Sequence, residues 1–221
     1  ILGIVLIPLP SLSDTIELTG IIRDFQDSHV DFELTTNQCS HTPNMVLATL
    51  GDNARPALNP ITENECADSS DSFGQWYQDF EGINQRTTHT FILENSPENP
   101  NTYSLNNPAF FPIDDLLFGN EGRDHNFHFT FELHASFAYE GGETFSFTGD
   151  DDVWVFINGH RVIDLGGLQS TMTQEISLDV IAEEHGLQTG EIYPFSFFFA
   201  QRQTGTSSSS IITTIGFVDP A

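Results

Sequence analysis

Three consecutive aspartates follow a strand-like stretch in the second half of the chain. Asp150, Asp151 and Asp152 stand between Gly149 and the apolar run Val153–Ile157. Calcium is held in proteins by about six to eight oxygens, and carboxylates are prominent among them. Neighbouring residues of a regular strand point to opposite faces, so two adjacent carboxylates reach one ion only where the backbone turns. The residues alone leave two interpretations open: a calcium site, or an acidic tight turn of the kind that Asp and Gly favour.

The charge balance of the chain is strongly acidic. It has 32 Asp and Glu residues against six basic residues, all of them Arg, and a formal net charge of −26. Such a field repels nucleic acid and anionic lipid, because binding either one requires phosphates to be neutralised. For most of the carboxylates a solvated acidic surface is a sufficient explanation. No run of 18 apolar residues is present, so we expect no nucleic-acid partner and no membrane insertion.

Most of the chain has the residue pattern of β-strands. From Phe127 to Phe137 apolar and polar residues alternate, which predicts a long strand with one face in a core. The dipeptide Asn158–Gly159 between two apolar runs predicts a hairpin. The expected strands are Thr15–Ile22, Thr87–Leu93, His125–Tyr139, Thr144–Thr148, Val153–Ile157, Arg161–Asp164, Glu175–Val180, Tyr193–Ala200 and Ile211–Val218.

Helical periodicity is weak, with short turns expected near Ser72–Phe80 and Ile113–Phe118. The predicted fold class is therefore all-β, a sandwich formed by a single domain over residues 15–221. We expect seven aromatic residues to be mostly buried in it: Phe127, Phe129, Phe131, Trp154, Phe156, Phe197 and Phe199. Trp154 is the least regular of these, because Val153 and Val155 share the opposite face of its strand.

The segment at about residues 37–86 is rich in Asn, Asp, Ser and Gly, and it predicts a loop-rich insertion packed on the sandwich. It holds the two cysteines of the chain, Cys39 and Cys66. One cysteine pair fits a disulfide that staples the insertion in an oxidising, extracellular compartment; two buried free thiols are the alternative. The pair Trp76–Tyr77 is interpreted as a small core of the insertion in preference to a sugar-stacking platform.

The first 14 residues form a separate apolar segment. Residues 1–10 carry no charge and include seven Ile, Leu or Val residues. This composition predicts a strand that docks on its own sandwich or is donated to the sheet of a neighbouring copy, where main-chain hydrogen bonds and alternate apolar side chains would hold it.

The run from Asn126 to Leu168, NFHFTFELHASFAYEGGETFSFTGDDDVWVFINGHRVIDLGGL, closely resembles the fibro-slime branch of the PA14 superfamily. Shorter matching pieces are RDFQDSHVDFE, FGQWYQDF, FFPIDDLLFGN and FFFAQRQT, so the resemblance covers most of the chain from residue 15. It implies a PA14-like β-sandwich. In the lectin-like members of this superfamily, two consecutive aspartates joined by a cis peptide bind a calcium ion.

Carried over by position, the resemblance implies calcium ligands at Asp150 and Asp151, joined by a cis bond. Gln201 and carbonyls of the stretch from Gln203 to Gly205 would complete the site. Many relatives of this branch have Glu–Arg where this sequence has Gln201–Arg202, so an amide oxygen would replace a carboxylate. Coordination positions left to solvent could then be taken by vicinal hydroxyls of a sugar.

The predicted function is a secreted, calcium-dependent carbohydrate-binding domain of the adhesin or lectin type, located outside the cell or on its surface. The alternative is a structural subunit of an extracellular fibre or slime that assembles by donation of residues 1–10. We expect no enzymatic activity, since the sequence has no Gly-x-Ser-x-Gly elbow, P-loop or zincin motif. The cluster Asp24, Asp27, Asp31 and Glu33 is either a second calcium site or, as we prefer, a structural turn.

Overall fold

The computed structural model describes residues 15–35, 38–51, 53–62, 65–96 and 98–218. The apolar segment 1–14, predicted as a docking or donor strand, lies outside the described residues. Strands dominate: β1 Thr15–Phe25, β2 Asn84–Asn95, β3 Tyr103–Asn107, β4 Phe129–Ala138, β5 Thr144–Gly149, β6 Asp152–Ile157, β7 His160–Leu165, β8 Met172–Ser177, β9 Ile192–Gln201, β10 Ser209–Thr213 and β11 Phe217–Val218. Two short helices, α1 Ser70–Gly74 and α2 Leu178–His185, complete the described elements.

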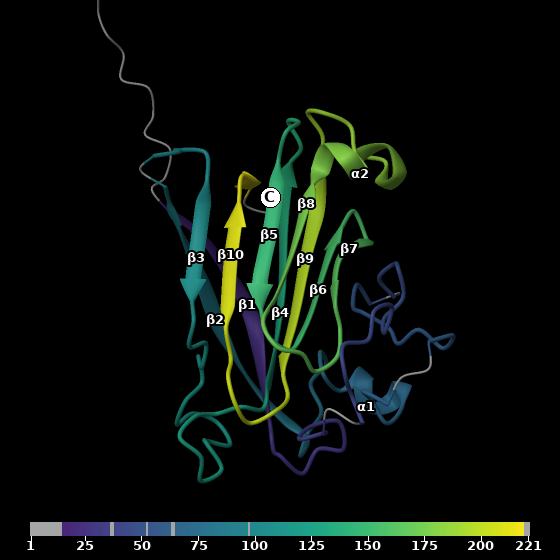
Figure 1. Cartoon of the computed structure of the whole chain (residues 1–221), viewed down its shortest axis with the longest axis vertical. Coiled ribbons are helices and arrows are strands. Elements are labelled where there is room, and N and C mark those ends of the chain that lie inside the picture. Colours follow the sequence, from purple (N-terminus) through teal and green to yellow (C-terminus); the bar gives the residue numbers. More distant parts are fainter. Residues whose placement is uncertain (1–14, 36–37, 52, 63–64, 97, 219–221) are drawn as a thin grey trace, which may run out of the picture.

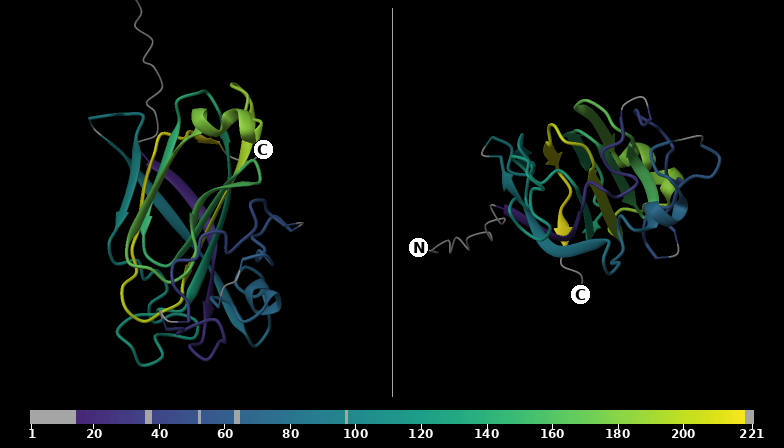
Figure 2. Two further views of the ribbon diagram at one scale, coloured as in Figure 1. Left: turned by 45° about the vertical axis from the view of Figure 1, so that its right-hand side comes forward. Right: turned by 90° about the horizontal axis from the view of Figure 1, so that it is seen from below.

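The strands form one continuous, nearly closed sheet. Its order is β7-β6-β9-β4-β1-β2-β3-β10-β5-β8, and β11 pairs with β4. The sheet folds over, so that β3, β10, β5 and β8 lie in one layer in front of the other strands (Figures 1 and 2). The two ends of the order meet where the Asp164 amide of β7 donates to the Gln174 side chain of β8 at 2.8 Å. The prediction of an all-β sandwich is confirmed.

Phenylalanine rings fill the space between the two layers. On β4, Phe129, Phe131 and Leu133 alternate with polar residues and point inward, as period-two spacing requires. The Phe131 ring packs at 4.7 Å from that of Phe91 and at 6.2 Å from that of Phe197, measured between centroids. All seven residues predicted to be buried are buried: Phe127, Phe129, Phe131, Trp154, Phe156, Phe197 and Phe199.

A second apolar cluster lies on the outer face of β6 and β9. There the segment between β1 and β2 covers Trp154 and Phe198 with Trp76 and Tyr77. The Trp76 and Trp154 rings lie 6.4 Å apart, and those of Tyr77 and Phe198 lie 5.0 Å apart. Strand β6 is therefore buried along both faces, which explains why both Trp154 and its valine neighbours are apolar. Trp76–Tyr77 belongs to this core, as the sequence indicated.

The covering segment is stapled by the predicted disulfide between Cys39 and Cys66. The two cysteines are 27 residues apart, and a cross-link of that span contributes about 3–4 kcal/mol by restricting the unfolded chain. Figures 1 and 2 place this segment beside β6 and β7, at the end of the sandwich where α1 lies.

Buried ion pairs join the same segment to the sheet. On β4, the Glu132 carboxylate accepts hydrogen bonds from Arg23 of β1 at 2.7 Å and from Arg55 of the segment at 2.8 Å. Burial opposes the ionisation of Glu132. Hydrogen bonds from His134 and Arg55 and the charges of Arg23 and Arg55 outweigh that effect and lower its pKa to about 2.

Several predicted strands differ from the structure. The strand expected over His125–Tyr139 begins at Phe129, and the one expected over Ile211–Val218 is divided into β10 and β11. The expected strand Glu175–Val180 ends at Ser177, and helix α2 follows it. Ser177 is the N-cap, Asp179 lies in the first turn, and Gly186 ends the helix in a left-handed conformation with φ 70°; these are the termini that helices favour. Strand β3 was not predicted, because its sequence YSLNN is short and mostly polar.

The carboxylate of Glu132 is expected to make stability depend on acid. Replacing Glu132 with Gln leaves the guanidinium groups of Arg23 and Arg55 without their charged partner, and should lower the free energy of unfolding at pH 7 by about 3 kcal/mol. The wild-type contribution is complete above pH 4.5 and is lost as the pH falls toward 2, because the pKa of Glu132 is lower in the folded state. Urea titrations at several pH values measure both effects. An unchanged midpoint at pH 7 would contradict the assignment.

Candidate functional site

The three aspartates and Gln201 meet at one end of the sandwich. Asp150 and Asp151 form the connection between β5 and β6, and Gln201 ends β9. The residues that follow Gln201 lead to Ser209, the first residue of β10, which pairs with Gly149 at the end of β5. In Figure 1 these connections lie at the lower end of the molecule. Sheet topology thus brings together segments that are about fifty residues apart in the sequence.

The chain turns sharply at the aspartates without a cis bond. None of the peptide bonds in the described part of the chain is cis, so the expected cis bond between Asp150 and Asp151 was wrong. The turn is made instead by Asp151, whose φ is 62°, in the left-handed region that Asp tolerates better than most residues. Gly149 is required beside it, because a Cβ there would lie 2.5 Å from the Ser208 carbonyl oxygen.

Asp150 is tied to the loop between β9 and β10. Its carboxylate accepts hydrogen bonds from the Ser208 amide at 2.5 Å, the Ser208 hydroxyl at 2.9 Å and the Thr206 hydroxyl at 2.6 Å. The residue is buried, with 3% of its surface exposed. Thr206 and Ser208 were not among the predicted site residues, although the hydroxyl-rich run from Thr204 to Ser210 was the signal that could have indicated them.

Asp151 is a buried carboxylate with little compensation. Its Oδ2 accepts one long hydrogen bond, from the Arg202 amide at 3.3 Å. Burial raises the pKa of Asp151 well above its usual range, and the neighbouring charge of Asp152 raises it further. Negative charge at this position is therefore costly in the protein alone, and a nearby cation would offset that cost.

The side chain of Asp152 has a structural role that differs from the roles of Asp150 and Asp151. Its Oδ2 contacts the Nε of Arg202 at 2.6 Å, and its Oδ1 accepts a hydrogen bond from the Gly167 amide at 2.6 Å. Both side chains of the ion pair have no exposed surface. Asp152 therefore holds the framework behind the site, and both of its oxygens are committed there.

Gln201 is buried with its amide nitrogen fixed and its amide oxygen free. The Nε2 donates to the carbonyl oxygens of Gln203 at 2.8 Å and Thr206 at 3.1 Å. Because carbonyls only accept, the NH₂ group must face them, and this determines the orientation of the amide. The Oε1 is buried without a hydrogen-bond partner. Buried polar atoms of native proteins rarely lack a partner, so this oxygen needs an explanation.

The remaining predicted ligands are placed less directly. The carbonyl of Gln203 faces the Gln201 amide, while its side chain donates to the Leu34 carbonyl at 3.2 Å. Gly205 is an exposed residue of the same loop. The structure thus brings Asp150, Asp151 and Gln201 to one loop junction and puts Gln203 and Gly205 at its outer edge.

The oxygens at this junction suit a hard cation. Two carboxylates, an unpaired amide oxygen and loop carbonyls are the donors that calcium takes in proteins, whereas zinc and copper favour nitrogen and sulfur. Within the described ranges no group of three or more His, Cys, Asp or Glu side chains is arranged around a common point, so any ion here would depend on amide and main-chain oxygens as well. The poorly compensated Asp151 carboxyl group and the unpaired Gln201 oxygen fit such an ion.

The second acidic cluster is structural, as preferred from the sequence. Asp24 accepts hydrogen bonds from the Asn126 side chain and the Phe118 amide. Asp31 binds the indole of Trp76 at 2.8 Å. Asp27 pairs with Arg123 at 2.8 Å. Each carboxylate therefore anchors a different loop, and the three do not share a site.

Glu33 belongs to a clamp on the β9–β10 loop. The buried ring of His128 lies between two carboxylates, with Nε2 at 2.7 Å from Glu33 and Nδ1 at 2.8 Å from Glu121. Glu33 also accepts hydrogen bonds from the amide and the hydroxyl of Thr204. Glu33, which is itself bound to His128, therefore fixes the position of the loop that carries Thr206 and Ser208. His128 is one of the polar positions in the alternating run from Phe127 to Phe137, and that pattern gives no sign of this role.

The chain is similar to part of several longer proteins. Two proteins of Dictyostelium discoideum are similar: "Protein psiQ" is 37% identical over 94% of this chain and 22% of its own length, and "Protein psiC" is 36% identical over 97% and 43%. The chain therefore spans less than half of these relatives. No helix in the described part of the chain is long and apolar enough to cross a membrane.

Similarity to solved structures is weak. A "PA14 sugar-binding domain from RTX adhesin" is 9% identical over 91% of this chain and 95% of that chain, with a TM-score of 0.34. The PA14 domain of the MpAFP antifreeze protein is 14% identical over 56% and 74%, also with a TM-score of 0.34.

A family model gives the decisive match. The model described as "PA14 domain" matches residues 95–217. These residues include β3 to β10, the first residue of β11, the three aspartates and Gln201. On this match the chain belongs to the PA14 domain family.

Proposed function

We propose that this domain binds carbohydrate outside the cell through a calcium ion held by Asp150, Asp151 and Gln201. The observation that carries the proposal is the free, buried Oε1 of Gln201 in the same loop junction as two buried aspartates, one of which is poorly compensated. A bound cation would satisfy the Gln201 amide oxygen and the Asp151 carboxylate at once, and Asp150 could supply a further ligand oxygen.

The protein's own residues would set the site before any ion arrives. Asp150 is oriented by Thr206 and Ser208, and the amide of Gln201 is oriented by two carbonyls. These contacts fix the ligand oxygens, so little ordering of side chains would accompany binding. When bound, calcium would supply positive charge and open positions for the paired hydroxyls of a sugar.

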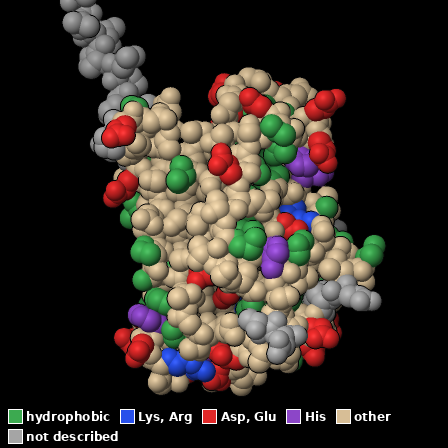
Figure 3. Space-filling model, in the orientation of Figure 1, with side chains coloured by type: hydrophobic (Ala, Val, Ile, Leu, Met, Phe, Trp, Pro, Cys, Tyr) green, Lys and Arg blue, Asp and Glu red, His purple; other side chains and the backbone are tan. Residues whose placement is uncertain are grey.

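The location of the site suits a surface ligand. It lies in loops at one end of a rigid sandwich, the usual position for binding residues on such scaffolds. Figure 3 shows that acidic side chains on the drawn face lie mainly toward the ends of the molecule, with few basic ones among them. Neutral glycans are compatible with such a surface, whereas anionic polymers are disfavoured.

Secretion and weak single-site binding complete the proposal. The disulfide supports an oxidising compartment. A site with few direct protein contacts to sugar gains strength by multivalent display, which links weak sites into strong attachment. Assembly into a fibre through residues 1–10 stays a prediction from the sequence.

Calcium should raise the melting temperature of the wild-type protein, and a chelator should reverse the rise. At a hundredfold excess over the dissociation constant, the stabilisation is about 2.7 kcal/mol. Asp151→Asn should abolish the calcium shift. Without calcium, the variant should be at least as stable as wild type at pH 7, since an ionised Asp151 is disfavoured by burial in the folded state.

The matched control is Glu81→Gln, which removes one exposed carboxylate between α1 and β2, outside the loops that carry the proposed ligands. Its calcium shift should equal that of wild type. Differential scanning fluorimetry with and without EGTA measures all three proteins. A wild-type melting curve that ignores both calcium and EGTA would refute the calcium site.

Sugar binding should require the same ion. We expect glycan-array signals from a multivalent, bead-coupled form of the domain in calcium. These signals should disappear in EGTA and in Asp151→Asn and persist in Glu81→Gln. Binding that survives chelation would place the sugar site elsewhere, and a blank array in calcium would restrict the proposal to calcium alone.

A further inference from the structure

Arg202 and Asp152 form a fully buried ion pair directly behind the proposed site. Their Nε–Oδ2 distance is 2.6 Å, and neither side chain has exposed surface. Each residue adjoins a proposed ligand in the sequence, since Asp152 follows Asp151 and Arg202 follows Gln201. The pair therefore joins the two chain segments that carry the ligands, one at the start of β6 and one at the end of β9.

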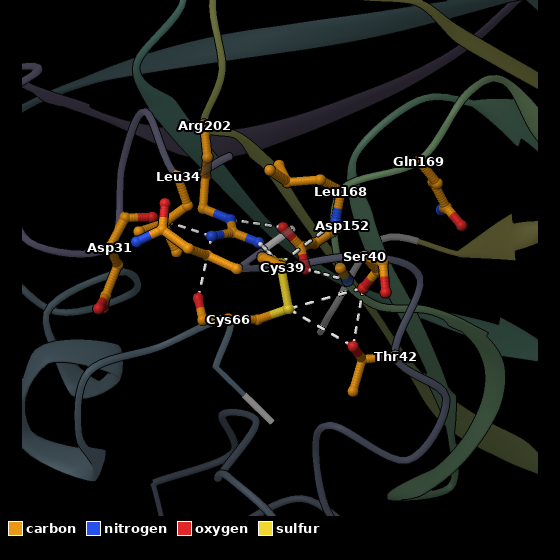
Figure 4. The surroundings of a disulfide bond; sticks show 12 residues. Asp31, Leu34, Cys39, Ser40, Thr42, Cys66, Asp152, Leu168, Gln169 and Arg202 are labelled. Carbon is orange, nitrogen blue, oxygen red and sulfur yellow. Dashed lines mark hydrogen bonds and ion pairs between the residues drawn. A yellow bond between two sulfur atoms is a disulfide. The ribbon is translucent and has the colours of Figure 1, made fainter. Parts of the chain in front are cut away.

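The disulfide contacts this pair from the other side. Figure 4 shows Arg202 pointing toward Cys39 and Cys66, with Asp152 beside it. The Nη2 of Arg202 lies 3.5 Å from the Cys39 sulfur, and its Nη1 donates to the Cys66 carbonyl at 3.0 Å. The amide of Leu168 lies 3.4 Å from the Cys39 sulfur as well. The cross-linked Cys39 and Cys66, together with Leu168, therefore form a wall that the guanidinium contacts.

This wall is also connected to Asp152 through Gly167. The Gly167 amide, next to Leu168 in the chain, donates to the Oδ1 of Asp152 at 2.6 Å. A Cβ on Gly167 would lie 2.0 Å from the Ser40 carbonyl oxygen, so this turn packs tightly on the residue that follows Cys39. One oxygen of Asp152 is thus held by Arg202, which contacts the disulfide, and the other by Gly167, whose neighbour Leu168 does.

The guanidinium is constrained in plane as well as in position. It stacks over the Trp76 ring, with 4.5 Å between its central carbon and the ring centroid. Its Nη1 also donates to the Asp31 carbonyl at 2.9 Å, and Asp31 in turn accepts from the Trp76 indole. A planar, multiply bonded Arg is much more rigid than a Lys would be.

We propose that Arg202 and Asp152 are positioning residues for the cation site, and that the Cys39–Cys66 disulfide maintains their geometry, so that cation affinity depends on its redox state. This inference rests on the proposed function. Residues that orient metal ligands typically change affinity by about 10–100-fold when they are altered. Reducing the disulfide should therefore weaken calcium binding by about tenfold or more, while the sandwich stays folded.

The chemical step is a two-electron reduction. A dithiol such as dithiothreitol would break the sulfur–sulfur bond and leave two thiols on the protein, with the reagent becoming the oxidised cyclic disulfide. The wall beside Arg202 then loses its cross-link, and the loops that hold Cys39 and Cys66 become free to separate. The ligand residues themselves are chemically unchanged.

The experiment compares oxidised wild type, reduced wild type, the double variant Cys39→Ala/Cys66→Ala, and Arg202→Lys with the disulfide intact. Phe145→Leu is the control, because it removes packing from the main core, where Phe145 of β5 contacts Phe195 of β9, and belongs to neither the covering segment nor the loop junction. Isothermal titration with CaCl₂ gives the dissociation constant of each protein. Far-UV circular dichroism verifies that each one is folded.

The expected pattern separates positioning from general destabilisation. Affinity should fall about tenfold in the reduced protein, in the double cysteine variant and in Arg202→Lys. Phe145→Leu should melt at a lower temperature and bind calcium as wild type does. Equal affinity in oxidised and reduced wild type would overturn the inference, and so would a comparable loss of affinity in Phe145→Leu.

A second measurement does not need calcium. Hydrogen exchange without metal should be faster after reduction at the amides of Arg202 and Ser208, which donate to Asp151 and Asp150. Unchanged exchange at both amides would refute the positioning role. If oxidised wild type binds no calcium but exchange responds to reduction, the proposed function fails and the positioning role stands.

Discussion

The buried pair of Arg202 and Asp152 is the contact on which the architecture of the loop end depends. Removing each charge from water costs on the order of several kcal/mol, which the mutual attraction repays only when the other polar atoms are satisfied. Here the Asp152 oxygens bind Arg202 and Gly167, and the guanidinium binds two carbonyls and stacks on Trp76. Because burying the pair costs free energy that only a specific geometry offsets, the pair holds the surrounding residues in a single arrangement.

That arrangement needs the insertion. A two-layer sandwich would leave the outer face of β6 and β9 in water, and Arg202 with it. The covering segment supplies Trp76, the disulfide and the carbonyls of Asp31 and Cys66. It also buries Trp154 and Phe198. The loop-rich segment is thus part of the core on one side and part of the support for the candidate site on the other.

Three buried carboxyl groups of this acidic chain have different surroundings, and their pKa values shift accordingly. On β4, Glu132 has two guanidinium partners and its pKa is lowered to about 2. At Asp24, burial raises the pKa to about 6 and the nearby charge of Glu121 adds to the rise, although hydrogen bonds from Asn126 and the Phe118 amide oppose it. At Asp151 burial again raises the pKa, and here the free oxygen of Gln201 lies in the same loop junction. Only the last of these settings combines an uncompensated carboxylate with an unsatisfied acceptor.

The amino-acid sequence by itself determined the features that depend on local pattern. The alternation in β4 and the hairpin at Asn158–Gly159 identified an all-β fold, because the side-chain period of a strand is readable over a few residues. The lone pair of cysteines and the Phe-rich strands identified the staple and the core. The family resemblance brought Asp150, Asp151 and Gln201 to attention as one set.

Only the tertiary structure decided how those residues are used. Asp150, Asp151 and Asp152 are chemically identical in the sequence, and their separate roles come from partners that lie from 15 to 58 residues away: Gly167, Arg202, Thr206 and Ser208. The trans turn at Asp151 and the support from Cys39 and Trp76 likewise follow from sheet closure and packing. Such contacts are set by the pairing of distant strands, and no local pattern of residues specifies them.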